Sequence, residues 1–526
     1  GAINAAHNNA LGTTAGTTTV LSGGALNLSN NVNVGEAITI SGTGVSNNGA
    51  IRNVSDSNTL SGLITLAANS EIQVDTGSTL TMDVASGNAI AGTYNLTIDS
   101  VGTSLVADPI ATSTGTLTKT GAGTLTLSGV NTYSGSTTIN AGTISIDDDS
   151  RLGTAPGSAT AGHLTLNGGT LLSTADFTLN ANRGVALGSS HGTFNVNSGT
   201  VLTVAGVIAG SNNLIKSGAG TLLLSGTNTY TGLTNIDAGK VQVTGTLSSS
   251  TMVDNEGVFD VDSTNTVGIV FGSGNVELAS GITLTTGDTN NRTISGVISG
   301  AGNLVKTGSG TLTLSGTNTY TGTTTISSGT LNIFADSGLG SAPGSATAGH
   351  LTLNGGTLRS PNTFTLNSNR GIALGSNNGT FNVHGSSTLT YGGIIAGSGS
   401  LTKVGTGTLV LTSQLSTYSG GTINDAGTLR LAATSIGSIG SATSGPIGTG
   451  SLTNNAILDV DGNLIHNTKT NNGTIINKPA PSTNFASSSI TAIYGDSITN
   501  TFTTDSNGTK TFSSSNTSSA TINSSN

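Results

Sequence analysis

The stretch GAGTLTLSGVNTYSGSTTINAGTISI at residues 121–146 decides the fold of this 526-residue chain. Apolar residues alternate in it with Thr and Ser, as in TLTL and TISI, and a period of two predicts β-strands. NTYSG and NAG lie between these runs, and their Asn and Gly tolerate the positive φ that turns require. Three very short strands, near 124–127, 137–140 and 143–146, therefore occupy roughly 22 residues, close to one turn of a β-solenoid.

The same phrase returns three more times, each time after a lysine two residues upstream. These copies begin at Gly218, Gly308 and Gly405, and the last, GTGTLVLTSQLSTYSG, contains one extra residue. A larger block is also duplicated: LGTAPGSATAGHLTLNGGTL from Leu152 returns almost unchanged from Leu339, 187 residues later. Self-similarity of this kind marks a repeat architecture, so the length of the chain does not require several globular domains.

The pattern predicts an all-β fold, a three-sided parallel β-helix over residues 1–478. Each turn would place one side chain of every alternating pair inward and bond its backbone to the turns above and below. About 21 residues per turn give roughly 22 or 23 turns and a rod on the order of 110 Å long. A second domain, the start of an immunoglobulin-like β-sandwich with its linker, is predicted for 479–526. There Pro479 and Pro481 interrupt the pattern and longer alternating runs follow.

Composition excludes several classes of function. The chain has no Cys and no Trp, and its formal net charge of -9 is spread thinly, without a basic cluster. These features remove disulfide and zinc–thiolate chemistry and make nucleic acid a poor candidate partner. No window approaches about 18 consecutive apolar residues, and the first residues lack a signal-peptide pattern, so we expect no membrane span. The missing initiator Met and the abrupt end indicate an internal piece of a longer protein.

The phrase K-x-G-x-G-T-L-x-L-S-G-x-N-T-Y-x-G followed by T-x-I-x-x-G-T-L-x-I resembles the autotransporter-associated β-strand repeat of bacterial passenger proteins. Three copies, at 119–146, 216–243 and 306–333, match it closely, and the fourth, at 403–431, replaces SGxNTY with TSQLSTY. The resemblance implies a right-handed parallel β-helix exported to the cell surface or beyond, for adhesion, aggregation or matrix building. The segment around residues 494–496 is similar to bacterial immunoglobulin-like modules of large adhesins.

Groups of acidic residues are the candidates for catalysis or cation binding. They comprise Asp254, Glu256, Asp260 and Asp262; Asp459 and Asp461; and the run Asp147, Asp148 and Asp149. Paired outward carboxylates could act as acid and base on a polysaccharide, or supply some of the six to eight oxygen ligands of Ca²⁺. The alternative interpretation is a solvated acidic patch that keeps neighbouring rods apart. Metal binding therefore stays unknown, and no catalytic or cofactor-binding residue is assigned.

Other polar residues recur at equivalent positions of the repeats. They are His163 and His350; Tyr133, Tyr230, Tyr320 and Tyr418; Lys119, Lys216, Lys306 and Lys403; and Arg183 and Arg370. We expect the histidines to be structural, the tyrosines to pack at corners rather than stack on glycans, and the lysines and arginines to be solvated. His191 and His384 do not correspond across the 187-residue offset, and spacing alone assigns no Ser-His-Asp triad.

The predicted function is that of a rigid structural or adhesive rod, and we expect no enzymatic activity and no cofactor. Ranks of outward Thr, Ser and Asn side chains can bond to a second copy of the rod, weakly per contact but strongly in total. An ice-binding role would need a strictly regular face, and the alternating spacing of the lysines argues against it. Two alternatives stay open: a passenger that binds or cleaves carbohydrate, and an inert spacer that presents a functional tip elsewhere.

Overall fold

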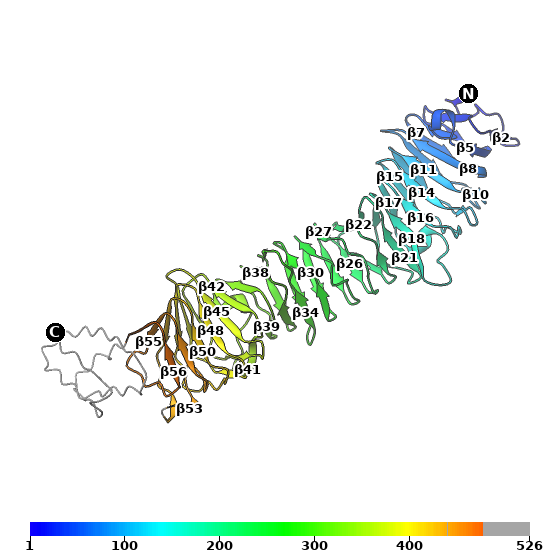
Figure 1. The fold of residues 1–526 in the computed structure, drawn as a ribbon. Helices are drawn as coiled ribbons and strands as arrows, with labels where there is room; N and C mark the ends of the chain where they lie inside the picture. Colours follow the sequence, from blue (N-terminus) through cyan, green and yellow to red (C-terminus); the bar gives the residue numbers. More distant parts are fainter. Residues whose placement is uncertain (439, 477–526) are drawn as a thin grey trace, which may run out of the picture.

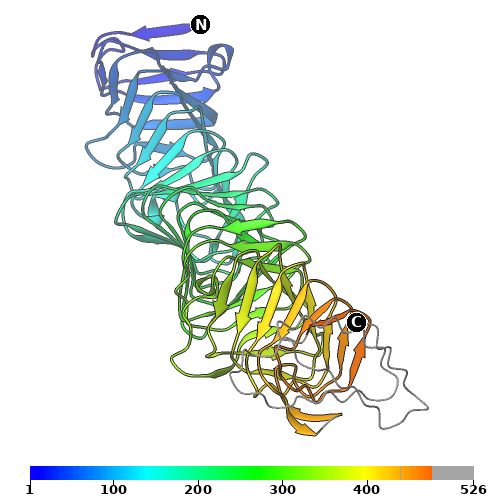
Figure 2. The same cartoon turned by 90° about the vertical axis from the view of Figure 1, so that its left-hand side faces the viewer.

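The computed structural model describes residues 1–438 and 440–476, which form one long solenoid of β-strands (Figure 1). About 23 turns follow one another, so sequence order runs from one end of the rod to the other. Figure 2 shows the successive turns as coils of a single spring-like winding. The predicted all-β parallel solenoid is confirmed, and its number of turns agrees with the estimate from the sequence. The immunoglobulin-like module predicted for 479–526 lies outside the described residues.

Strands of neighbouring turns pair in parallel. β14 (Leu117–Thr120) pairs with β16 (Thr137–Ile139), one turn later. Likewise β15 (Thr124–Leu127) pairs with β17 (Thr143–Ile146), so the strands predicted in the first repeat are confirmed. This pairing builds long sheets, of which the largest contain 14 and 12 strands. Several sheets begin and end along the rod, and its right-handed, three-sided cross-section stays a prediction.

A continuous apolar core fills the rod because the strand pattern alternates. In β15, Leu125 and Leu127 are buried while the threonines beside them stay half-buried. Leu125 lies opposite Ile144, and Ile144 lies opposite Leu171 in the turn after that, so aliphatic side chains stack along the axis. Burying each such side chain contributes about 2 kcal/mol. The core therefore spreads its stabilisation evenly over the turns, as expected for a repeat protein.

Turn length changes where the duplicated block inserts a loop. The turn from Leu117 to its ladder partner Thr137 has 20 residues, whereas the next, from Thr137 to Leu164, has 27. The longer turn contains the 3-10 helix η2 (Asp149–Leu152). Its equivalent, η3 (Asp336–Leu339), lies 187 residues later, so the duplication read from the sequence repeats in the fold.

Helix is almost absent, and in the described part of the chain no helix is long and apolar enough to cross a membrane. The third 3-10 helix there, η1 (Val45–Asn47), is a short turn near the first coils. Among the described strands one pair is antiparallel, the hairpin of β52 (Ile436–Ser438) and β53 (Ser441–Ser444). This hairpin projects from the side of the rod (Figure 1).

Candidate functional sites along the rod

The lysine that precedes each repeat phrase is buried at a corner of the rod, so the prediction that these lysines are solvated is wrong. The ammonium group of Lys216 donates hydrogen bonds to carbonyl oxygens of its own corner, at Ser217 and Gly218 (2.8 and 2.7 Å). A third bond of 3.1 Å reaches the carbonyl of Ala238 in the next turn. The same carbonyl contacts surround the other buried repeat lysines, which are Lys119, Lys306 and Lys403.

The lysine cage, meaning each of these ammonium groups with its three carbonyls, ties two turns together. Burial lowers the pKa of all four lysines to about 8, so they remain protonated at neutral pH. Sequence reasoning placed them in solvent because Lys is rarely buried without a partner. The partner here is the backbone itself. The recurring K-x-G-x-G spacing, which brings carbonyls around the ammonium, was the signal that could have identified the cage.

The arginines of the duplicated block are also buried rather than solvated, which corrects a second prediction. Arg183 opens β21 (Arg183–Leu187), and its Nε donates to Asp149 Oδ1 at 3.0 Å. Its Nη1 and Nη2 donate to the carbonyls of Leu152 and Gly153, both at 2.9 Å. His163 Nδ1 lies 3.0 Å from Nη1. In the second copy the equivalent buried group is Arg370, bonded to Asp336, Leu339 and Gly340.

This network explains the acidic run before the loop. Asp149 is the carboxylate that binds Arg183, and it is also the one acid of the run that the second copy retains, as Asp336. Asp148 accepts a hydrogen bond from the backbone N–H of Ser150 at the start of η2, and Asp147 pairs with Arg151 at 2.7 Å. The three carboxylates therefore serve three separate structural contacts instead of converging on one ion.

Acid is expected to loosen the duplicated block before the rest of the rod. Burial, followed by the nearby guanidinium, lowers the pKa of His163 and of His350 below their usual value. The unfolded chain thus binds protons at a higher pH than the folded chain. Stability that these turns have above about pH 6.5 is lost as the pH falls through the lowered pKa values.

Hydrogen exchange followed by mass spectrometry from about pH 7.5 to about pH 5, corrected for the intrinsic pH dependence of exchange, measures this effect. Peptides covering 160–187 and 347–374 should lose protection first. Peptides covering 201–224, which contain no histidine, serve as the control. Uniform loss along the rod would contradict the expectation.

The acidic residues at 254–262 divide between two sheets and do not form one site. Asp254 lies in β29 (Val253–Asn255), while Asp260 lies in β30 (Val258–Val261), which belongs to a different sheet. Glu256 follows the first strand, where Ser273 donates a hydrogen bond to it. The four carboxylates that the sequence grouped together therefore face two directions.

Asp260 belongs to a charged cluster that the sequence did not reveal. Lys240 Nζ lies 3.0 Å from Asp260 and 2.6 Å from Glu277, and so joins three successive turns. Gln242 donates to Asp262 at 2.6 Å. Asp260 is only 8% exposed, so the solvated-patch interpretation is wrong for this residue. Burial raises the pKa of Asp260 and the bond from Lys240 opposes that rise.

Asp459 and Asp461 share a single basic partner. Arg430 Nη2 lies 2.7 Å from Asp461, and its Nε lies 3.8 Å from Asp459. Within the residues that the structure describes, no group of three His, Asp or Glu side chains is placed to hold a metal ion. His191 and His384 are exposed turn residues, far apart in the winding.

The repeat tyrosines pack inside the corners, which confirms the corner-packing prediction. Tyr230 is fully buried, and its hydroxyl is 2.6 Å from Thr234 Oγ1. A ring in this position has no face free for a sugar. The other tyrosines with the same burial and the same threonine contact are Tyr133, Tyr320 and Tyr418.

Comparison with known proteins agrees with this architecture. The passenger-associated-transport-repeat family matches residues 117–146, 214–243, 304–333 and 401–431, and each matched segment contains one lysine cage. Over 356 residues, 63% of the chain, the sequence is 35% identical to "Adhesin BmaC autotransporter" of Brucella suis biovar 1 (strain 1330). The matched region spans 10% of that adhesin's length.

No solved structure matches the chain significantly. The repeat and the adhesin relative together support a location at the cell surface or outside the cell. The chain carries the repeat of autotransporter passenger proteins and resembles an autotransporter adhesin, as its sequence phrases predicted.

Proposed function

We propose that this chain is a rigid, non-enzymatic rod of a surface adhesin, and that it attaches through long polar faces rather than through one pocket. The charged groups support this proposal, because the buried ones are engaged within the rod by cages and ion pairs. What the rod offers to the outside is mostly uncharged. The similarity to an autotransporter adhesin favours the same interpretation.

The observation that carries the proposal is a column of threonines on the outer face. Thr124 opens β15 and lies opposite Thr103 in the preceding turn and Thr143 in the following one. These residues alternate with buried aliphatic side chains, so they face outward. We define this threonine ladder by its six residues in ladder register, Thr79, Thr103, Thr124, Thr143, Thr170 and Thr193.

A ladder of hydroxyls suits self-association or binding to another polar surface. Successive members are about 4.8 Å apart, the spacing of paired strands, so a second rod can present matching groups. One hydrogen bond across such a contact contributes about 1 kcal/mol, and repetition along the rod multiplies the effect. Affinity would then depend on rod length rather than on any single residue.

Beads coated with the purified chain are expected to aggregate as the surface density of protein rises, and light scattering measures the aggregation. Replacing three ladder residues by Lys (Thr124→Lys, Thr143→Lys, Thr170→Lys) should abolish it, because like charges would line the face while the core is unchanged. The matched control replaces the same three residues by Ser and keeps the hydroxyls. Aggregation that survives the Lys variant would contradict a role for the ladder.

The same assay separates the alternatives. Beads that stay dispersed under all conditions would identify the rod as a spacer. Beads that aggregate only when a polysaccharide is added would favour a carbohydrate-binding passenger. Aggregation that EDTA reverses would bring the exposed carboxylates back as cation ligands.

A further inference from the structure

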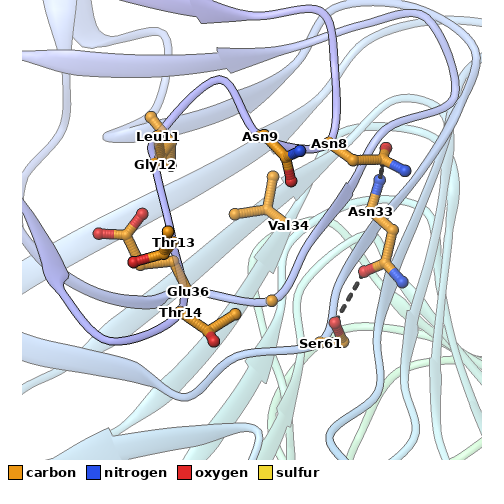
Figure 3. A pocket seen from close by; sticks show the side chains of 11 residues that line it. Asn8, Asn9, Leu11, Gly12, Thr13, Thr14, Asn33, Val34, Glu36 and Ser61 are labelled. Atoms are coloured by element: carbon orange, nitrogen blue, oxygen red, sulfur yellow. Dashed lines mark hydrogen bonds between the residues drawn. The ribbon is translucent and has the colours of Figure 1, made fainter.

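A hollow of about 610 Å³ lies among the first turns of the rod (Figure 3). The loop between β1 (Ala2–Ala5) and β2 (Thr17–Val20) forms one wall, and the turn that follows β4 (Asn33–Val34) forms the other. Its volume falls within the range of small-molecule sites in proteins, about 300–1,000 Å³. Nothing in the repeat pattern indicated it, because the loop belongs to no repeat.

Glu36 gives this hollow its chemical character. The side chain lines the hollow but is only 6% exposed. Its Oε1 accepts a hydrogen bond from Thr18 Oγ1 at 2.9 Å, whereas its Oε2 is buried and has no hydrogen-bond partner. A buried carboxylate oxygen without a donor is unfavourable, and such an atom in a native protein calls for an explanation. A donor supplied by a ligand provides one.

The rest of the lining selects among possible donors. Asn8 Oδ1 accepts from the backbone N–H of Asn33 at 2.9 Å, and Asn33 Oδ1 accepts from Ser61 Oγ at 2.7 Å (Figure 3). These bonds hold amide and hydroxyl groups around the hollow, while Leu11 and Val34 add apolar surface. The lining contains no Lys or Arg, so it does not favour an anion. A single carboxylate is a poor start for Ca²⁺, which needs six to eight oxygen ligands.

We propose that this hollow binds a neutral sugar unit, one of whose hydroxyl groups donates to Glu36 Oε2. Asn and Thr groups of the loop then bond to further hydroxyls, and the apolar face of the ring packs against Leu11 and Val34. This site is independent of the threonine ladder. It would give the rod one specific contact near an end, in addition to weak contacts along its sides.

Saturation-transfer NMR on the full chain tests the proposal, with the methyl glycosides of glucose, galactose, mannose and N-acetylglucosamine as probes. At least one glycoside should bind. Glu36→Gln should weaken its affinity roughly tenfold or more, because a bond to a charged group is lost while size and the contact with Thr18 are kept. The matched control is Glu71→Gln, a half-buried carboxylate in β8 (Ile64–Val74) outside the hollow, which should leave the affinity unchanged.

A second variant fills the space without touching the carboxylate. A Cβ at Gly35 would lie 3.3 Å from Thr14 Cγ2 and 3.5 Å from Ser61 Oγ, between the two walls, so Gly35→Val should also abolish binding. Unchanged exchange protection over 64–74 shows that both variants stay folded. The proposal is overturned if no glycoside binds, or if Glu36→Gln binds as tightly as the parent chain. Calorimetric heat from CaCl₂ alone that Glu36→Gln removes would overturn it in favour of a cation site.

Discussion

Replacing Arg183 by Met is expected to lower the local free energy of unfolding of the turns at 149–187 by about 3 kcal/mol. The guanidinium is fully buried and satisfies four acceptors, the Asp149 carboxylate, the carbonyls of Leu152 and Gly153, and His163 Nδ1. Methionine fills much of the volume but donates nothing. The carboxylate and the carbonyls would then be left with too few donors in a place that water reaches poorly.

Hydrogen exchange read peptide by peptide is the appropriate measurement, because a long solenoid does not unfold as one two-state unit. The duplicated turns at 336–374 provide an internal control in the same molecule. A matched variant is Arg151→Met, whose partner Asp147 is half exposed, and its cost should stay below about 1 kcal/mol. Equal effects of the two substitutions would contradict the role assigned to Arg183.

A double-mutant cycle separates the ion pair from the other bonds. If Asp149→Asn costs much less in the Arg183→Met background than in the parent chain, the two residues are directly coupled. The coupling is expected because the pair is 3.0 Å apart and its basic member is inaccessible to solvent. Additive effects would assign the stability to the carbonyl contacts instead.

The fold could be predicted from the sequence because its determinants are local and repeated. Alternation in TLTL fixes which face of β15 is buried, and NAG fixes where the chain turns. The ladder partners then follow from spacing alone, since equivalent residues recur about every 20 positions, as Leu117 and Thr137 do. The duplication also predicted correctly that His163 and His350 have equivalent surroundings.

The fate of individual polar residues could not be predicted in the same way. Lys216 and Arg183 look like surface residues, because their partners are backbone carbonyls or a carboxylate tens of residues away. The cluster around Lys240 likewise joins three turns, and the hollow at Glu36 depends on how a non-repeated loop folds back. Contacts between turns are invisible to a one-turn pattern unless the length of every intervening turn is known.

One consequence is that a repeat phrase carries more than strand pattern. The retained acid Asp336 and the lost acids beside it show that duplication preserved the carboxylate that binds a buried guanidinium. Similarly, the four repeat lysines keep their cages although the residue between lysine and glycine varies among Thr, Ser and Val. Recurring charge in such a rod therefore indicates internal cross-links between turns before it indicates a binding surface.

Replacing Gly239 by Ala is expected to destabilise its corner by about 3 kcal/mol or more. This glycine has φ +69, a conformation that costs an L-residue about 1–2 kcal/mol. A Cβ there would also lie 2.4 Å from the carbonyl oxygen of Gly220, 2.5 Å from that of Gly218 and 2.8 Å from Lys216 Nζ. The lysine cage closes against this corner, so the two turns would have to separate to admit one methyl group.

Gly199→Ala isolates the steric part of that cost. Gly199 has nearly the same backbone conformation, φ +77, but a Cβ there would meet nothing within 4 Å. It should therefore lose only the conformational term, about 1 kcal/mol. Exchange protection over 214–243 for Gly239→Ala and over 192–204 for Gly199→Ala gives the two values. If the two substitutions cost the same, the glycines of the repeat serve only the turn conformation, and close stacking of corners around the lysine contributes nothing measurable.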